Sequence, residues 1–419
     1  MRILGKFFKK LGPGMVTGAA DDDPAGIATY SVAGARFNLK LLWSSFFTLP
    51  LMIAVQEMCA RLSMVSGRGL ASTFKLFYGK KVLVLAVALL FAANTFNIGA
   101  DLSIMAASVK LLWPGASALL VIILIAAVSL ILEIILSYRV YFHLLKWLCL
   151  ALLAYWATAA LVVTDWGEIF KNLLWIQWEF SRDYWLMLVA FLGTTISPYL
   201  FFWQAGQEME DEINEHRGTI ALRKGATAAE IGKMRFDVFS GMIFSNLTTF
   251  FIIITTAATL HQAGIYNITS AADAASALRP LAGDAAYLLF TIGIIGTGLL
   301  AIPVLAGSVA YALAELLKWR EGLSVKFKKA MGFYLIMAAA ILTGVLMNLF
   351  NLNPISALIY SAVLNGLIAP LFIAMIIKSA NSRHLMGDLK NGPWSNIFGW
   401  LAFAVMTAAG LIFIISLFL

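Results

Sequence analysis

Long runs of apolar residues, separated by short polar segments, occupy most of the chain. A helix that crosses a bilayer needs roughly 20 mostly apolar residues, and the sequence contains eleven runs suited to that length. We therefore predict an all-α membrane protein that forms a single transmembrane domain over residues 1–419. The predicted spans lie at about 11–36, 41–65, 82–108, 117–137, 142–164, 184–207, 236–262, 284–317, 330–350, 355–378 and 396–418.

Two of these runs contain a proline near their middle. The first run contains DDDPAG at residues 21–26, and the sixth contains GTTISPY at residues 193–199. Proline removes a backbone donor and disfavours helical geometry at the preceding residue, so we expect the helices to unwind at Asp23 and Ser197. Bare backbone at this depth in a membrane must line a cavity. Both breaks are therefore candidate parts of a binding site.

The two broken runs are the first members of two successive sets of five. Matched interruptions in corresponding helices are typical of transporters built from two inverted repeats. We predict repeat 1 at about 11–164, repeat 2 at about 184–378, and an extra helix at about 396–418.

Composition agrees with a membrane protein. Hydrophobic residues make up 61% of the chain and charged residues only 12%, whereas soluble domains contain about 25% charged residues. The two cysteines, Cys59 and Cys149, both lie in apolar runs, which excludes a disulfide framework.

The basic residues are distributed unevenly between the two sides of the membrane. If the N-terminus is cytoplasmic, 24 of the 30 Lys and Arg residues lie in inside segments. The positive-inside rule then predicts a multi-pass protein of the inner (plasma) membrane, with a cytoplasmic N-terminus and an extracellular C-terminus. The basic residues of these loops account for the net charge of +8. We therefore expect the lipid bilayer as a partner and no nucleic acid. We also expect a monomer. The six outside residues are Arg36, Lys40, Lys110, Lys171, Arg182 and Arg279.

Asp23 is the strongest candidate for chemistry. A carboxylate in the hydrocarbon costs at least ~2.5 kcal/mol unless it faces water, a partner or an ion. Carboxylate, carbonyl and hydroxyl oxygens at the breaks suit a hard cation such as Mg²⁺, Ca²⁺ or Mn²⁺. The four histidines fall in loops or at span ends. We interpret Asp21 and Asp22 mainly as solvated vestibule charges, with direct ligation as the alternative.

Other polar residues in the spans have two interpretations each. Asn94, Asn97 and Asp101 share one helix face, either as a hydrogen-bonded clamp between helices or as part of an ion path. Asn365 shares a face with Ser361 and borders the predicted cavity.

Two charged groups are assigned to structure. Glu57 and Arg61 are spaced as an intramembrane ion pair. The acidic segment 207–212 is predicted to be a solvated cytoplasmic helix, with an acidic funnel for cations as the alternative.

Several motifs together resemble the NRAMP divalent-metal transporters. DPAG at 23–26 resembles the family's Asp-Pro-Gly-Asn break, and ISPY at 196–199 resembles its Met-Pro-His break. The resemblance covers nearly the whole chain and includes GPG at 12–14, the segment 56–68 and DL at 101–102. It implies a LeuT-like inverted repeat of 5+5 helices plus an eleventh, a transporter without catalytic residues or cofactors, and a divalent ion as substrate.

The departures from the family pattern point to one branch. Gly26 replaces the family's metal-binding asparagine, Ser197 its methionine and Tyr199 its histidine. These changes resemble the NRAMP-related magnesium transporters, and small side chains would leave room for a hydrated ion. Further replacements concern other family residues. Gln204 replaces a second histidine, and Ala362 replaces a glutamine. Asn94 and Ile104 replace two glutamates that the family associates with its proton route.

The resemblance implies a transporter of Mg²⁺, partly hydrated, and also of Mn²⁺, that works by alternating access without proton coupling. The alternatives are a proton-coupled Mn²⁺/Fe²⁺ symporter, an Na⁺-coupled carrier of organic solutes and, least supported, a membrane enzyme. The implied metal site consists of Asp23, Gly26, Thr194, Ser197 and Tyr199, and the implied cavity or pathway of Ala25, Asp22, Asn94, Asn97, Asp101, Gln204, Ala362 and Asn365.

Overall fold

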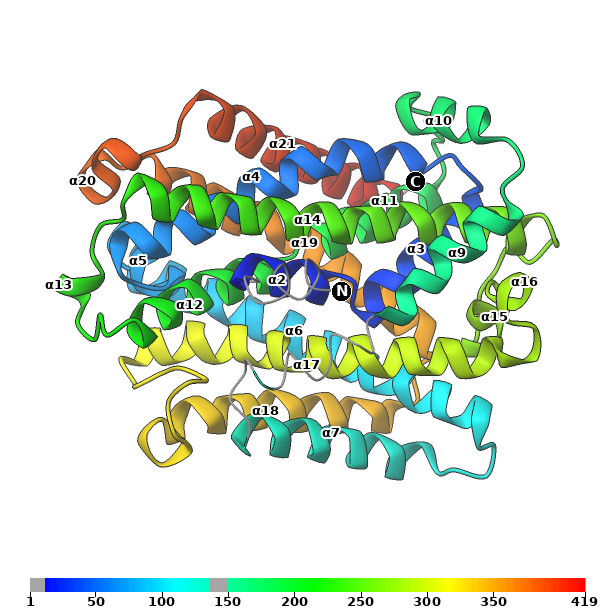
Figure 1. Ribbon diagram of the computed structural model, residues 1–419, viewed down its shortest axis with the longest axis horizontal. Coiled ribbons are helices and arrows are strands. Elements are labelled where there is room, and N and C mark those ends of the chain that lie inside the picture. The colour runs from blue at the N-terminus through cyan, green and yellow to red at the C-terminus, as the bar shows by residue number, and fades with distance from the viewer. Residues whose placement is uncertain (1–11, 136–139, 141–149, 419) are drawn as a thin grey trace, which may run out of the picture.

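Helices that run side by side along one direction form the whole of the described chain (Figure 1). A computed structural model describes residues 12–135, 140 and 150–418, and these contain helices but no strand. The predicted all-α class is confirmed. The long helices are α4 (Leu42–Ser66), α6 (Lys80–Leu112), α7 (Ala118–Ile135), α14 (Ala228–Thr256), α17 (Ala286–Leu317), α18 (Met331–Met347), α19 (Pro354–Ala380) and α21 (Pro393–Ser416).

The first and sixth predicted spans are each two helices. The first is α2 (Pro13–Asp21) followed by α3 (Pro24–Phe37), and the sixth is α11 (Arg182–Thr195) followed by α12 (Pro198–Asn214). In both cases a proline starts the second helix, where its fixed φ suits the first turn and its missing N–H costs nothing. The predicted breaks are therefore present.

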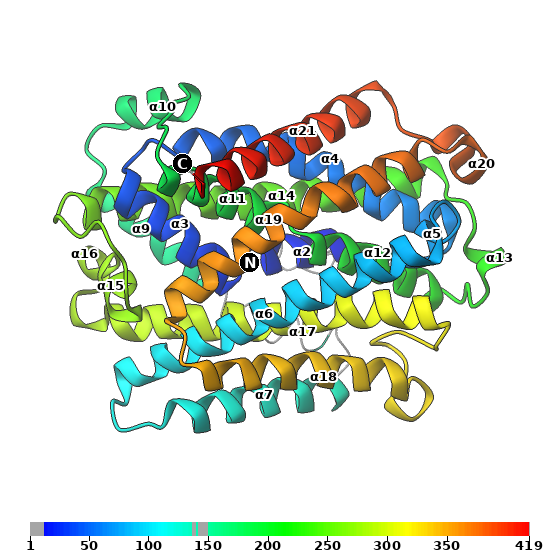
Figure 2. The same ribbon diagram turned by 180° about the vertical axis from the view of Figure 1, so that it is seen from behind.

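The broken helices lie in the middle of the molecule. In both views α7 and α18 lie along one edge and α4 and α21 along the other, with α2 and α12 between them (Figures 1 and 2). Burial is highest for α11–α12, where 94% of the most apolar stretch is buried, and low for α7, α18 and α21, at 28%, 39% and 33%, whereas α4 is 78% buried. The peripheral helices expose leucine and isoleucine on their outer faces, as lipid contact requires.

Nine helices of the described residues are long and apolar enough to cross a membrane. Each half of the first span is shorter than a spanning helix by itself. The fifth predicted span, 142–164, lies partly outside the described residues, and its described part is a 3₁₀ turn, Leu150–Leu152, and α9 (Leu153–Val162).

Short helices close the two ends of the molecule. The end with α5 (Leu70–Phe74), α13 (Ile220–Arg223) and α20 (Arg383–Met386) lies opposite the end with α10 (Trp166–Leu174), α15 (Ala271–Ser276) and α16 (Arg279–Ala282) (Figure 1). None of these was predicted. Five of them are too short to give a periodic apolar pattern, whereas α10 has one, with apolar residues at 166, 169, 170, 173 and 174, but is far shorter than a membrane span.

The acidic segment 207–212 differs from its prediction. It is not a solvated loop helix but the last turns of α12, and Glu208, Glu210 and Glu212 are buried. Glu210 accepts hydrogen bonds from Tyr311 and from the backbone N–H groups of Leu323 and Ser324. The carboxylate thereby connects α12 to α17 and to the segment after it.

Candidate functional site

Asp23 lies in the extended segment between α2 and α3 and is only 1% exposed. Its Oδ1 accepts the backbone N–H of Gly26 at 2.7 Å, which caps the first turn of α3. Its Oδ2 accepts from Asn97 Nδ2 at 3.1 Å and from the Tyr199 hydroxyl at 3.2 Å. The carboxylate is thus held by α3, α6 and α12 together.

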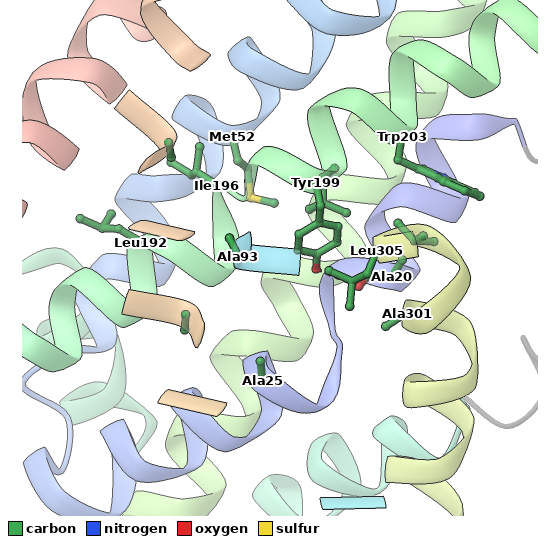
Figure 3. Close-up of a cluster of buried hydrophobic side chains, with 14 of the residues drawn as sticks. Ala20, Ala25, Met52, Ala93, Leu192, Ile196, Tyr199, Trp203, Ala301 and Leu305 are labelled. Carbon is green, nitrogen blue, oxygen red and sulfur yellow. Dashed lines mark hydrogen bonds between the residues drawn. The ribbon is translucent and has the colours of Figure 1, made fainter. Parts of the chain in front are cut away.

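Further hydrogen bonds orient these partners. Ser361 Oγ on α19 donates to Asn97 Oδ1 at 2.8 Å, which fixes the amide so that its Nδ2 faces Asp23. The Tyr199 ring extends from the start of α12 toward Ala20, at the end of α2 (Figure 3). Both broken helices, α6 and α19 therefore meet at this point.

Asp101 is a second carboxylate of the site. It lies on α6 one turn beyond Asn97, is fully buried, and neither of its oxygens has a hydrogen-bond partner. It interacts electrostatically with Asp23. No described Lys or Arg forms an ion pair with either carboxylate. Two buried carboxylates without a basic partner form an environment that favours a bound cation.

Gly26 is closely surrounded. A Cβ at this position would lie 3.2 Å from the Asp21 carbonyl oxygen and 3.3 Å from Thr194 Oγ1. Gly26 and Thr194 are therefore neighbours across the two breaks, as the predicted site requires. The extra room expected from the glycine is not present at this position.

Ser197 and Ala362 both contact the last turn of α11, Ser197 through its hydroxyl and Ala362 through its backbone carbonyl. The Ser197 hydroxyl, in the break before α12, donates to the carbonyls of Gly193 at 2.5 Å and Thr194 at 2.9 Å, so its proton is used by the last turn of α11. The Ala362 carbonyl would lie 2.0 Å from a Cβ on Gly193, which shows how closely α19 approaches α11. Ala25, 2% exposed, lies in the first turn of α3 beside the break (Figure 3).

Three predicted pathway residues do not contact the Asp23 carboxylate. Asn94 donates to the Leu305 carbonyl at 3.0 Å and to Ser308 Oγ at 2.7 Å, and so clamps α6 to α17. Gln204 accepts from Thr17 Oγ1 and donates to Glu208 Oε1, further along α12. Asn365 is buried on α19, and its Oδ1 has no hydrogen-bond partner.

Asp21 and Asp22 are not solvated charges. Both are fully buried, and Ser245 Oγ on α14 donates to Asp21 Oδ2 at 2.5 Å and approaches Asp22 Oδ1 at 3.4 Å. The vestibule interpretation is wrong because α14 packs directly against α2. Ser245 was not predicted, although it begins a polar stretch of the predicted span 236–262 that also contains Asn246, Thr248 and Thr249.

The donor set consists of oxygens and amides. No group of three or more His, Cys, Asp or Glu side chains in the described chain gathers closely enough to hold a metal ion. Cys59 is buried on α4, and Cys149 lies outside the described residues. The remaining groups are two carboxylates, amides, hydroxyls and the carbonyls at the ends of α2 and α11. Helix C-termini carry partial negative charge, which also favours a cation.

Comparison with protein families and relatives gives a consistent result. The family model described as natural resistance-associated macrophage protein-like (Nramp) matches residues 14–416. The divalent metal cation transporter MntH of Klebsiella pneumoniae (strain 342) is 24% identical over 414 residues, covering 95% of this chain and 92% of that protein. MntH 1 of Pseudomonas aeruginosa is 25% identical over 427 residues, covering 97% and 91%.

Solved structures share the fold. A manganese transporter of Eremococcus coleocola, in complex with an aromatic bis-isothiourea compound, has a TM-score of 0.74 at 18% identity and covers 96% of this chain and 85% of its own. MHP1, a nucleobase-cation-symport-1 family transporter in a closed conformation, has a TM-score of 0.52 at 14% identity, covering 96% and 90%. The predicted LeuT-like fold is confirmed, while the repeat boundaries stay predictions.

Proposed function

Because the chain belongs to the Nramp family, we propose that it is a secondary-type transporter that carries Mg²⁺, and also Mn²⁺, across the membrane by alternating access without proton coupling. It is a multi-pass membrane protein of a transporter family and not an enzyme. The names of its relatives, divalent metal cation transporters and a manganese transporter, support a divalent metal ion as substrate.

The observation that carries the choice of Mg²⁺ is the donor set around Asp23. Carboxylates, an amide, hydroxyls and carbonyls are hard ligands, and neither sulfur nor imidazole lies among them. Mg²⁺ takes oxygen ligands and keeps several of its waters, and Mn²⁺ accepts the same ligands. Since Gly26 is closely surrounded here, we propose that a hydrated ion enters only when the halves of the broken helices separate.

The absence of proton coupling is supported by the residues that stand at the family's proton route. Asn94 is an amide tied to α17, and Ile104 is apolar. Neither side chain can take up and release a proton at physiological pH. His261 lies on the π-helical turn that follows α14, and its Nδ1 is hydrogen-bonded with the Ala35 carbonyl near the end of α3. It therefore contacts neither break.

Orientation and assembly belong to the same proposal. We propose that the end with α5, α13 and α20 is cytoplasmic, as the basic loops there favour, and refer to it as the inner end. The N-terminus then lies inside and the C-terminus outside, and the protein works as a monomer.

Direct binding tests the site. Titration of Mg²⁺ or Mn²⁺ into purified protein should give saturable binding, and Asp23→Ala should weaken it at least about tenfold, a loss of about 1.4 kcal/mol. Asp23→Asn is the matched variant, because asparagine still caps α3 but removes the charge. Equal weakening by both substitutions assigns the effect to the carboxylate's charge. Unchanged binding in both would refute the site.

Flux into liposomes tests the substrate and the coupling separately. We expect Mg²⁺ entry into vesicles that hold a Mg²⁺ indicator, with no accompanying acidification in vesicles that hold a pH indicator. Failure of Mg²⁺ to enter while Mn²⁺ enters would favour the ordinary family substrate. Entry matched by proportional acidification would establish the proton-coupled alternative.

A further inference from the structure

The break between α2 and α3 has a second polar cluster, on the side that faces α14. It consists of Asp21 and Asp22 at the end of α2, Tyr30 on α3, and Ser245 and Thr249 on α14, and all five are fully buried. None of them hydrogen-bonds to the Asp23 carboxylate, whose partners Asn97 and Tyr199 come from α6 and α12. The two polar groups thus use different sides of one break.

The two carboxylates of this cluster have too few donors. A single hydroxyl, Ser245 Oγ, serves both Asp21 Oδ2 and Asp22 Oδ1. Asp21 Oδ1 and Asp22 Oδ2 are buried without any hydrogen-bond partner. An unpaired charged oxygen inside a protein costs several kcal/mol, so either protons or a bound cation must neutralise the pair.

Two more oxygens in the cluster also lack partners. The Tyr30 hydroxyl and Thr249 Oγ1 are fully buried and unpaired. Tyr30 lies next to Thr249 and interacts electrostatically with Asp21 and Asp22. Its ring carbon Cε2 and the Asp21 carbonyl oxygen lie equally near, 3.2 Å, to a Cβ placed on Gly26. Tyr30 therefore lies close to the break as well as to Thr249.

Four buried carboxylates lie around the break between α2 and α3, more than one divalent ion would balance. Asp21, Asp22, Asp23 and Asp101 are all buried, and no described Lys or Arg forms an ion pair with any of them. One divalent ion at Asp23 and Asp101 balances two of these carboxylates. Asp21 and Asp22 remain, with a combined charge that a second divalent ion matches.

We propose that Asp21, Asp22, Tyr30, Ser245 and Thr249 form a second site for a divalent metal ion, beside the Asp23 site and separated from it by the unwound backbone. The inference rests on the proposed function, because the ion is taken to be the transported one. Carboxylate and hydroxyl oxygens are the ligands of hard cations. A monovalent ion would leave one of the two carboxylates without a counter-charge.

The number of ions bound per chain tests the second site. Purified full-length protein is dialysed to equilibrium against increasing Mn²⁺, and free Mn²⁺ is measured by electron paramagnetic resonance. We expect two Mn²⁺ per chain in the wild type and one in Asp22→Asn, which keeps the size of the side chain. Asp23→Asn should also bind one, held by the second cluster.

Neutral substitutions provide a test that does not depend on the acidic variants folding. Thr249→Val and Tyr30→Phe each remove one unpaired oxygen at nearly constant volume. Each should weaken one of the two binding steps about threefold to tenfold and leave the other unchanged. Thr256→Val is the matched control, since Thr256 lies on the same helix but its hydroxyl donates to the Ile252 carbonyl. It should leave both steps unchanged.

The outcomes separate the two proposals. Two ions in the wild type, one in Asp22→Asn and a selective effect of Thr249→Val support the second site. One ion in the wild type, lost in Asp23→Asn, would overturn the second site and leave the proposed function intact. Binding of no ion would overturn both. A wild-type stoichiometry of one that rises to two only with added Na⁺ would also overturn the divalent assignment.

Discussion

In the Asp23 carboxylate, Oδ1 accepts the N–H that starts α3 while Oδ2 accepts from Asn97 and Tyr199. The oxygens are thus oriented before any ion arrives, which reduces the entropy cost of binding. The same hydrogen bonds must weaken or rearrange when an ion takes Oδ2. Ion entry and the position of α12 are therefore linked through the Tyr199 hydroxyl.

Ser197 gives a prediction at the residue scale. Ser197→Cys places sulfur where the resemblance to the family indicates a methionine, with little change in volume. Because sulfur prefers soft metals, Cd²⁺ affinity should rise at least about tenfold, about 1.4 kcal/mol, while Mg²⁺ affinity should not rise. Competition of Cd²⁺ with Mn²⁺ during titration measures the change. Ser197→Ala is the control, and a Cd²⁺ affinity equal in both variants would remove Ser197 from the site.

The sequence predicted the site unevenly. Asp23 could be predicted because a carboxylate before a mid-membrane proline has few structural explanations. The different roles of Asn94 and Asn97 could not be predicted, because residues three apart on a helix share a broad face. Only the packing of α17 and α19 decides which partner each amide meets. Ser245 was missed because several polar residues recur beside it in the same span, and the sequence does not show which of them faces the break between α2 and α3.

At the scale of elements, α2 crosses α14 at a contact made by glycines. A Cβ on Gly241 would lie 2.1 Å from the Gly14 carbonyl oxygen, and one on Gly18 would lie 2.2 Å from the Gly241 carbonyl oxygen. Asp237, one turn earlier on α14, accepts the N–H groups of Gly12 at 2.9 Å and Gly14 at 2.6 Å. Small residues thus allow close approach, while Asp237 satisfies the start of α2.

This crossing predicts opposite effects for two alanines on one helix. Gly241→Ala should lower the free energy of unfolding by roughly 1–3 kcal/mol, because the added methyl group meets backbone that cannot move aside. Gly232→Ala, also on α14 but with no heavy atom near its added Cβ, should raise it by up to about 1 kcal/mol through helix propensity. Thermal unfolding in detergent measures both. Similar midpoints for the two variants would contradict the proposed contact.

Long elements were predictable and short ones were not. The apolar runs locate nine described spanning helices because a bilayer demands a fixed length of apolar helix. The end of α12 was misplaced because Glu208, Glu210 and Glu212 look solvated in sequence. Glu210, for example, accepts hydrogen bonds from Tyr311 and Leu323 of other elements, which no local pattern reveals.

At the scale of the whole molecule, the two ends are closed by different interactions. At the end with α10, Arg36 pairs with Asp183, and Lys40 with Glu179 at 2.7 Å. The hydrogen bond from Lys40 holds the pKa of Glu179 below its usual value, so this pair contributes at neutral pH and is lost only as the pH falls through that lowered pKa. The inner end instead gathers carboxylates, with Glu210 and Glu315 near Glu321.

Glu321, in the segment between α17 and α18, should make the stability of the inner end depend on pH. Burial, and then the charges of Glu315 and Glu210, raise its pKa from 4.5 to about 10. The folded protein therefore holds a proton that the unfolded chain releases, and stability falls as the pH rises between these two values. Glu321→Gln should remove this slope, so that its unfolding midpoint exceeds that of the wild type by a margin that grows from pH 5 to pH 9. Glu215→Gln, which removes an exposed carboxylate near the same end, is the control and should leave the slope in place. Parallel wild-type and Glu321→Gln midpoints across this range would show that Glu321 is ionised in the folded protein.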